Sequence, residues 1–239
     1  MGLVLFDTET TGFTDDSKII QLAFIYQDKD VTNIYSDYIN PENVKISTKA
    51  MSVHHITPDM VQNSSIFEES DIVKKFISFN TDKNVLIAHN INFDLNMIQK
   101  EQITWLGPII CTLRCARHIF KDLESYSLQY LRYELGLYKE EQDFLASLDS
   151  CKNLQPHDAV FDVIITRLLL RRLLHEVNGS VIKLIELTQT PVFINKMRFG
   201  KYAGEELVNI DPGYLRWLLY NHSDLDSDLK YSIRRVLGE

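Results

Sequence analysis

The sequence is short of cysteine, of long apolar runs and of basic residues. Its 239 residues include three cysteines, an odd number that gives no disulfide framework. Cys111 and Cys115 lie four positions apart without a second pair, so they do not have the spacing of a zinc site. These features favour a protein of the reducing cytoplasm.

Membrane proteins and passive nucleic-acid coats are also disfavoured. The densest apolar stretch, residues 160–174, carries four charged residues and predicts a core helix, so we expect no membrane partner. The formal net charge is −8, which argues against a basic nucleic-acid coat. It does not exclude an enzyme that meets phosphate through metal ions, because carboxylate ligands themselves make a sequence acidic.

The pattern of apolar residues predicts an α/β fold with five strands. Residues 4–6, 18–26 and 33–39 predict an antiparallel three-strand meander. Residues 85–88 and 109–111 predict two further strands, and the helical patterns around them imply parallel crossovers. The expected architecture is a mixed sheet flanked by helices.

Helix and linker signals divide the rest of the chain. Residues 65–68 (Ser-Ile-Phe-Glu) have the form of a capping box, which predicts the start of a helix. A long apolar helix opens at 156–162, and residues 178–180 (Asn-Gly-Ser) are the best linker candidate. We therefore predict a domain at 1–177 and a small, mostly helical C-terminal module at 181–239.

Two carboxylates end the first predicted strand. Side chains alternate along a strand, so Asp7 and Glu9 point the same way. The pair is repulsive and resists desolvation, and a divalent cation such as Mg²⁺ or Mn²⁺ relieves both costs. On this spacing alone, a solvated strand end before a glycine turn is an equal alternative.

Two later segments supply further acidic residues. Asp94 opens a helix after the strand at 85–88, and Asp162 lies in the first turns of the long apolar helix. Four carboxylates converging from three segments would be destabilised without metal. The pattern indicates a two-metal phosphodiester hydrolase, in which one ion activates the attacking water and the other stabilises the leaving 3′ oxygen.

His157 lies five residues before Asp162, which would place the two about 140° apart on a helix. We therefore expect His157 in the loop or first turn before the helix, with Asp162 pointing in from the helix. An imidazole beside the attacking water suits a general base, because its pKa lies near the working pH. A lone histidine is more often a surface or capping residue, but Pro156 and the acidic segments reverse that preference.

Four short motifs resemble those of the DnaQ-like 3′–5′ exonuclease superfamily, in its DEDD group with a histidine base. They are residues 6–12 (Phe-Asp-Thr-Glu-Thr-Thr-Gly), 54–57 (His-His-Ile-Thr), 88–94 (Ala-His-Asn-Ile-Asn-Phe-Asp) and 157–162 (His-Asp-Ala-Val-Phe-Asp), in the family's order. His55 departs from the family pattern, which usually has glycine at this position. The resemblance spans most of residues 1–176.

The resemblance implies a ribonuclease-H-like fold and a defined set of site residues. The implied cofactor is a pair of Mg²⁺ ions, with Mn²⁺ as a substitute. The implied catalytic residues are Asp7, Glu9, Asp94 and Asp162 as metal ligands, with His157 as general base. The residues implied to contact nucleic acid are Thr8, Thr10, Gly12, Phe13, His54, Ile56, Thr57, Asn90 and Phe93.

The resemblance also implies the substrate. Residues 199–204 and 211–218 resemble the tail of DNA-degrading members, which favours DNA over RNA. The expected activity is removal of nucleotides from the 3′ ends of single- and double-stranded DNA, in repair or recombination. Relatives often dimerise, but no interface can be read from this chain.

Two features admit two interpretations each. Phe13 follows the first motif, where an exposed ring can stack on or wedge beside the terminal base, or the ring can be buried in the core. A basic-aromatic group in the tail can hold a nucleic-acid backbone, or its charges can be merely solvated. Its members are Lys196, Arg198, Lys201 and Tyr202.

Three other functions are alternatives. An RNA-trimming exonuclease needs the same metal site, and no residue here identifies recognition of a 2′-hydroxyl. A proofreading subunit requires a partner-binding tail, and no such motif stands out. A non-catalytic nucleic-acid-binding module is expected to lack one of the five catalytic residues, and the sequence has all five.

Overall fold

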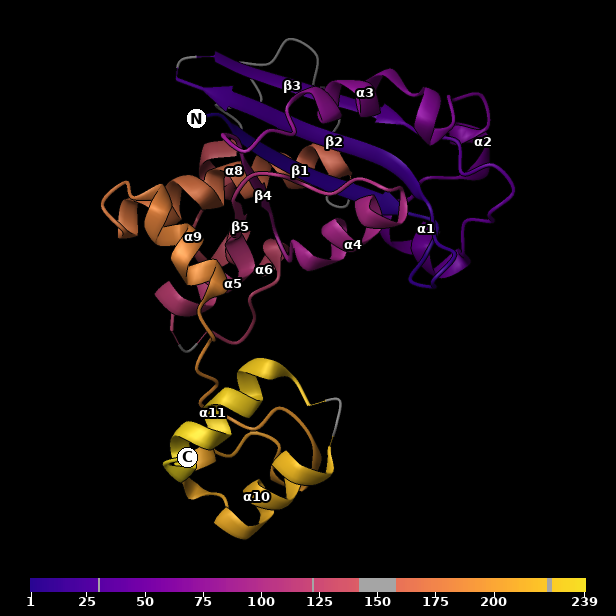
Figure 1. The fold of residues 1–239 in the computed structure, drawn as a ribbon. Helices are drawn as coiled ribbons and strands as arrows, with labels where there is room; N and C mark the ends of the chain where they lie inside the picture. The colour runs from indigo at the N-terminus through magenta and orange to yellow at the C-terminus, as the bar shows by residue number, and fades with distance from the viewer. Residues whose placement is uncertain (30, 122, 142–157, 223–224) are drawn as a thin grey trace. The chain divides into compact units, whose positions relative to one another are not determined.

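The chain divides into two compact units, Met1–Thr188 and Gln189–Glu239 (Figure 1). The structure, a computed structural model, describes residues 1–29, 31–121, 123–141, 158–222 and 225–239. The first unit contains the sheet and every acidic residue singled out above. None of the described helices is long and apolar enough to cross a membrane.

A five-stranded mixed sheet forms the centre of the first unit. Its strands are β1 (Leu3–Thr10), β2 (Ile19–Asp28), β3 (Val31–Tyr38), β4 (Val85–Ala88) and β5 (Ile109–Cys111). Their order in the sheet is β3-β2-β1-β4-β5. The strands β1, β2 and β3 pair antiparallel, whereas β4 pairs parallel with both β1 and β5. The predicted meander and parallel crossovers are therefore confirmed.

Helices cover both faces of this sheet (Figure 1). On one face, α3 (Asp71–Ser78) and α4 (Asn92–Lys100) pack against alternate residues of β1 such as Val4 and Phe6. On the other, α8 (Ala159–Glu176) packs against Leu5. The helices α5 (Thr112–Ile119), α6 (Leu128–Glu134) and α9 (Val181–Gln189) extend that second layer. Both faces of β1 are thus buried, which fixes the direction of each β1 side chain.

The helix expected after residues 65–68 begins later. Residues Phe67–Glu69 form a short 3₁₀ helix, and α3 starts at Asp71, so the predicted capping box is wrong. The reason is a competing pairing, because the backbone N–H of Asn40 donates to the carbonyl of Ser65 at 3.0 Å. Asn40 also forms a parallel bridge with Ile66, which keeps this segment extended.

Two short helices follow β3 and place the second motif. They are α1 (Thr48–His54) and α2 (Pro58–Val61), with Thr57 as the N-cap residue of α2. Ile46, Ala50 and Ile56 pack with Ile20 of β2 in a small separate core. This packing brings the 54–57 segment against the strand that follows the first motif.

The second unit has its own small core. Its described helices are the 3₁₀ turns Gly200–Tyr202 and Leu207–Asn209, α10 (Pro212–Asn221) and α11 (Ser227–Leu237). Met197, Leu207 and Leu215 are among its buried residues. Leu184 of α9 belongs to the core of the first unit instead, because it packs with residues of α5 and α8.

Candidate active site

The carboxylates of Asp7, Glu9 and Asp162 meet beside β1. Asp7 and Glu9 project from the same face of β1 as Leu5, the face that α8 covers. Asp162 lies in the first turn of α8. One carboxylate oxygen of each residue lies within 4.8 Å of the other two, and the described residues contain no second cluster of this kind.

Asp94 is held against the same strand by Thr8. It lies in the first turn of α4 and is 3% exposed. Its Oδ1 accepts hydrogen bonds from the Thr8 backbone N–H at 3.1 Å and from Thr8 Oγ1 at 2.8 Å. Since Thr8 lies between Asp7 and Glu9, these bonds hold Asp94 near the cluster. Its charge raises the pKa of Asp7, although Asp94 is not one of the three carboxylates within 4.8 Å of one another.

Burial and mutual repulsion raise the pKa values of these acids. Burial raises the pKa of Asp7 well above its ordinary value, and the charges of Asp94, Asp162 and Glu9 raise it further. The same causes raise the pKa of Glu9 to about 9. Burial raises the pKa of Asp94 to about 7, although its hydrogen bonds with Thr8 oppose the shift. The site therefore favours protons or cations over bare carboxylates.

The stability of the metal-free protein is expected to fall between pH 6 and pH 9. The folded pKa values of Glu9 and Asp94 exceed their ordinary values of 4.5 and 3.8, so the folded protein binds more protons than the unfolded chain. That stabilisation is complete at low pH and is lost as pH rises through about 7 and then about 9. One pKa unit corresponds to about 1.4 kcal/mol, and we expect at least one such loss.

Thermal melts with EDTA and with Mg²⁺ measure this effect. With EDTA, we expect the melting temperature at pH 9 to lie several degrees below that at pH 6. Mg²⁺ should raise the melting temperature more at pH 9 than at pH 6, because a bound cation stabilises the ionised carboxylates. An equal Mg²⁺ effect at both pH values would contradict the linkage.

Gln21 joins the start of α8 to the sheet beside the site. It is buried and lies opposite Glu9 in the β1–β2 register. Its Nε2 donates to Asp158 Oδ1 at 3.4 Å, and its Oε1 accepts from the Ala159 backbone N–H at 3.2 Å. Asp158 is a fifth carboxylate that sequence reasoning missed, and its charge also raises the pKa of Glu9. The available signal was only its N-cap position before an apolar run.

His54 shapes the loop that follows β1. It is buried, its Nδ1 accepts from the Ile56 backbone N–H at 3.0 Å, and its Nε2 donates to the Thr10 carbonyl at 3.1 Å. Thr10 is buried as well and donates from Oγ1 to the Gly12 carbonyl at 2.8 Å. These side chains therefore hold backbone in place, whereas Thr57 at the start of α2 is exposed.

The backbone conformation at His55 explains why glycine is usual at this position of the motif. It ends α1 with a positive φ of 62°, a left-handed conformation that glycine adopts without strain. His55 is exposed. Histidine in place of glycine therefore still adopts the left-handed conformation that ends α1.

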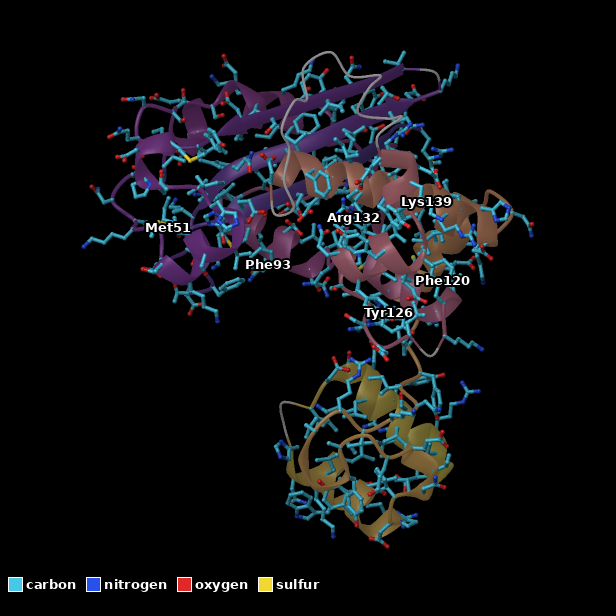
Figure 2. All side chains as sticks on the ribbon, turned by 180° about the vertical axis from the view of Figure 1, so that it is seen from behind. Met51, Phe93, Phe120, Tyr126, Arg132 and Lys139 are labelled. Atoms are coloured by element: carbon cyan, nitrogen blue, oxygen red, sulfur yellow. The ribbon has the colours of Figure 1, made fainter. Side chains whose placement is uncertain are left out.

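His89 anchors the third motif and is a poor candidate for a base. Its Nδ1 lies 3.0 Å from Thr112 Oγ1, and its Nε2 lies 2.9 Å from the carbonyl of Tyr126. Burial lowers the pKa of His89 to about 4, which keeps the ring neutral. The Tyr126 hydroxyl in turn donates to the carbonyl of Phe120 at 2.6 Å, and Figure 2 labels both residues. Asn90, the next residue, is exposed and has a positive φ of 63°.

Phe13 lies on the surface, so the core alternative for this residue is wrong. Its side chain is 68% exposed, and its ring centroid lies 5.8 Å from that of the partly buried Phe93 (Figure 2 labels Phe93). The Nζ atom of Lys49 lies 5.7 Å from the centroid of the Phe13 ring. Phe13 and Lys49 both line an open hollow of about 640 Å³. Its lining is Thr11, Gly12, Phe13, Thr14, Asp16, Asn43, Val44, Lys45, Ser47 and Lys49.

The predicted general base cannot be placed by the structure. His157 lies outside the described residues, and α8 begins two positions later at Ala159. The structure therefore brings together the four predicted carboxylates and the aromatic pair of Phe13 and Phe93. The role of His157 stays a prediction.

The fold and the acidic cluster define a nuclease of the ribonuclease-H-like class. Residues 4–170 match the RNase_T exonuclease family. The chain belongs to this family, and the predicted membership of the DnaQ-like superfamily is confirmed.

Known proteins resemble the chain over different lengths. Exodeoxyribonuclease 10 of Escherichia coli K12 is 27% identical over 239 residues, which cover 98% of each chain. DNA polymerase III subunit epsilon of Aquifex aeolicus is 31% identical over 145 residues, 56% of this chain and 67% of that protein. A solved structure of exonuclease X in complex with 5′ overhanging duplex DNA has a TM-score of 0.62 at 24% identity. It covers 78% of this chain and 99% of that one, and it shares the fold.

Proposed function

We propose that this protein is a metal-dependent 3′–5′ exodeoxyribonuclease that hydrolyses the terminal phosphodiester bond of DNA. The observation that supports the proposal most directly is the convergence of Asp7, Glu9, Asp94 and Asp162 from three segments. Within an exonuclease family, such a cluster at the end of the central strand is a site for phosphoryl chemistry.

The donor set fits two Mg²⁺ ions, with Mn²⁺ as a substitute. All the donors are carboxylate oxygens, the ligands that these hard cations prefer. Burial, and then the negative charge of neighbouring carboxylates, raise the pKa values of Asp7 and Glu9, and a bound cation would offset both effects. Bound ions would lower the pKa of the attacking water and neutralise charge on the leaving 3′ oxygen.

The chain's own residues would hold the ions, accept a proton and attract the nucleic acid. Asp7, Glu9, Asp94 and Asp162 would hold the ions, and Glu9 would also approach the 3′-hydroxyl of the terminal nucleotide. His157 would take the proton of the attacking water as general base, since imidazole exchanges protons near neutral pH. Lys45 and Lys49, both exposed at the hollow next to Phe13, would attract the nucleic-acid backbone.

DNA is favoured over RNA by the similarity along the whole chain. The relative named exodeoxyribonuclease 10 matches both units, whereas the polymerase subunit matches only 56% of this chain. We also propose a role in repair or recombination. We further propose a cytoplasmic location, which agrees with the free and buried state of Cys111 and Cys115.

Replacing Phe13 with alanine should impair duplex ends more than single strands. The ring is exposed beside Phe93 and can stack on or wedge beside the terminal base pair. Loss of one stacking contact, worth about 1–3 kcal/mol, predicts a reduction of about 5- to 150-fold on blunt duplexes. Initial rates on matched single- and double-stranded substrates measure the difference. Equal losses on both substrates would exclude a wedge.

The proposed activity is tested with matched DNA and RNA oligonucleotides labelled at the 5′ end. We expect a ladder that shortens from the 3′ end of DNA with Mg²⁺ and disappears with EDTA. A ladder on RNA alone would assign the chain to the RNA-trimming branch. Absence of cleavage by well-folded protein would favour a non-catalytic binding module.

A further inference from the structure

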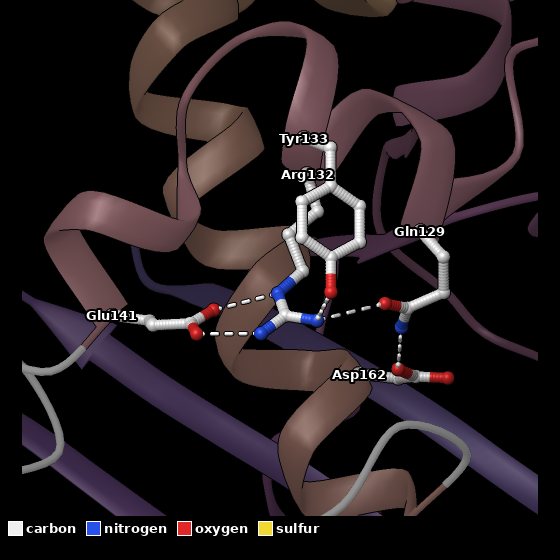
Figure 3. A network of polar contacts seen from close by, with 5 residues as sticks. All are labelled: Gln129, Arg132, Tyr133, Glu141 and Asp162. Carbon is white, nitrogen blue, oxygen red and sulfur yellow. Dashed lines mark hydrogen bonds and ion pairs between the residues drawn. The ribbon is translucent and has the colours of Figure 1, made fainter.

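A partly buried polar network, with Gln129, Arg132 and Tyr133 on α6, reaches the carboxylate of Asp162 (Figure 3). The Nε2 atom of Gln129 donates to Asp162 Oδ1 at 3.0 Å, and in Figure 3 the other Asp162 oxygen points away from Gln129. Gln129 and Asp162 lie 33 positions apart, on helices that pack against each other.

Arg132 decides which way the Gln129 amide faces. Its Nη1 donates to Gln129 Oε1 at 3.4 Å. A guanidinium has donors only, so the amide oxygen must face Arg132, and the amide nitrogen must then face Asp162. In the reversed amide, Gln129 Oε1 would face the Asp162 carboxylate, which also only accepts. Gln129 Nε2 would face Arg132 Nη1, which also only donates.

Arg132 is itself fixed by several contacts. Its Nε and Nη2 atoms donate to the two Glu141 carboxylate oxygens at 2.7 and 2.6 Å, a bidentate pair in which both side chains are 11% exposed. Its Nη1 also donates to the Tyr133 hydroxyl at 3.0 Å. The guanidinium carbon lies 4.9 Å from the ring centroid of Phe161, the residue before Asp162.

The network orients Asp162 without neutralising it. The charge of Arg132 is paired with Glu141, and the group through which this network touches Asp162 is a neutral amide. A lysine or arginine in place of Gln129 would compete with a cation for the carboxylate. A neutral donor instead fixes the rotamer of the carboxylate and preserves its charge for a metal ion.

We propose that Gln129 is a positioning residue for the metal ligand Asp162, and that the Arg132–Glu141 ion pair fixes the amide of Gln129. The proposal rests on the proposed function, because it assigns Asp162 to a metal ion. Hydrogen-bonding partners of metal ligands typically change metal affinity or activity by 10- to 100-fold when they are replaced.

The test compares Gln129→Met with Gln99→Met. Methionine matches glutamine in size but cannot donate to Asp162, and Gln99 is exposed on α4. Mn²⁺ binding is measured by calorimetry without DNA, and kcat and KM are measured on single-stranded DNA over a range of Mg²⁺ concentrations. We expect Gln129→Met to bind Mn²⁺ about tenfold more weakly, to lose kcat at low Mg²⁺ and to recover at high Mg²⁺. Gln99→Met should match the unmodified protein in both measurements.

A second variant tests the part assigned to Arg132. Arg132→Lys keeps the charge but loses the bidentate geometry, so it should weaken Mn²⁺ binding in the same direction. The double variant should be no worse than Gln129→Met, because both substitutions act through the same amide. Additive losses would overturn the proposed link between Arg132 and Gln129.

The outcomes separate this proposal from the proposed function. Unchanged Mn²⁺ affinity and an unchanged Mg²⁺ requirement in Gln129→Met, in a protein that degrades DNA, would overturn the positioning role alone. If the unmodified protein does not degrade DNA, the proposed function fails, and the Mn²⁺ affinities still decide whether Gln129 orients the ligand.

Discussion

Asp7→Asn is expected to abolish nuclease activity while making the metal-free protein more stable. Asp7 belongs to the acidic cluster, and burial and four neighbouring carboxylates raise its pKa well above the ordinary value. An amide removes the negative charge that repels those neighbours, so the melting temperature in EDTA should rise by several degrees. It also removes a metal ligand, and we expect a loss of rate on the order of 10³-fold or more.

Two measurements on one variant make this expectation specific. Rates of DNA degradation with Mg²⁺ and melting temperatures with EDTA should change in opposite directions. Asp82→Asn, at an exposed position before β4, is the control and should change neither. A variant that loses both activity and stability would contradict this expectation. It would show that the Asp7 carboxylate stabilises the metal-free fold.

His157→Gln should reduce the rate by about 10²- to 10⁴-fold, the usual contribution of a positioned general base. Because His157 is not among the four carboxylates, its removal should leave Mn²⁺ affinity unchanged. The unmodified protein should gain activity as pH rises through the pKa of an imidazole, about 6.5, and the variant should lose this limb of the profile. Rates at saturating Mg²⁺ between pH 5.5 and 8.5 measure both effects.

His175→Gln provides the matched control for this substitution. His175 lies near the end of α8 with its side chain 79% exposed, so its replacement should change neither the rate nor the pH profile. A His157→Gln protein with an unaltered profile would exclude the imidazole as the base. A loss of Mn²⁺ affinity in that variant would instead indicate a metal-binding role for His157.

The sheet and the pairing of Asp7 with Glu9 could be predicted because they depend on short-range patterns, whereas Asp94 and Asp162 join this pair through long-range packing. The alternation along β1 placed Asp7 and Glu9 on one side, and the apolar runs at β4 and β5 required parallel crossovers. The start of α3 could not be predicted in the same way. Local preferences at Ser65 are overridden by its pairing with Asn40, a residue 25 positions away.

The hydrogen-bond partners of the side chains at the candidate site could not be predicted from the sequence either. Gln129 and Gln21 are polar residues in otherwise ordinary elements, and their importance depends on which neighbour each one faces. The contact between Thr8 and Asp94 joins residues 86 positions apart. Such contacts arise from the packing of helices on the sheet, which periodicity describes only as a buried or an exposed face.

The wide separation of the acidic residues along the chain has a consequence for protein synthesis. Asp7 lies in β1 and is synthesised 155 residues before Asp162, which belongs to the last long helix of the first unit. A nascent chain that ends before α8 lacks both this carboxylate and the helix that covers Leu5. Hydrolytic competence therefore arises only when the whole α/β layer is complete, so truncated translation products should be inert toward DNA.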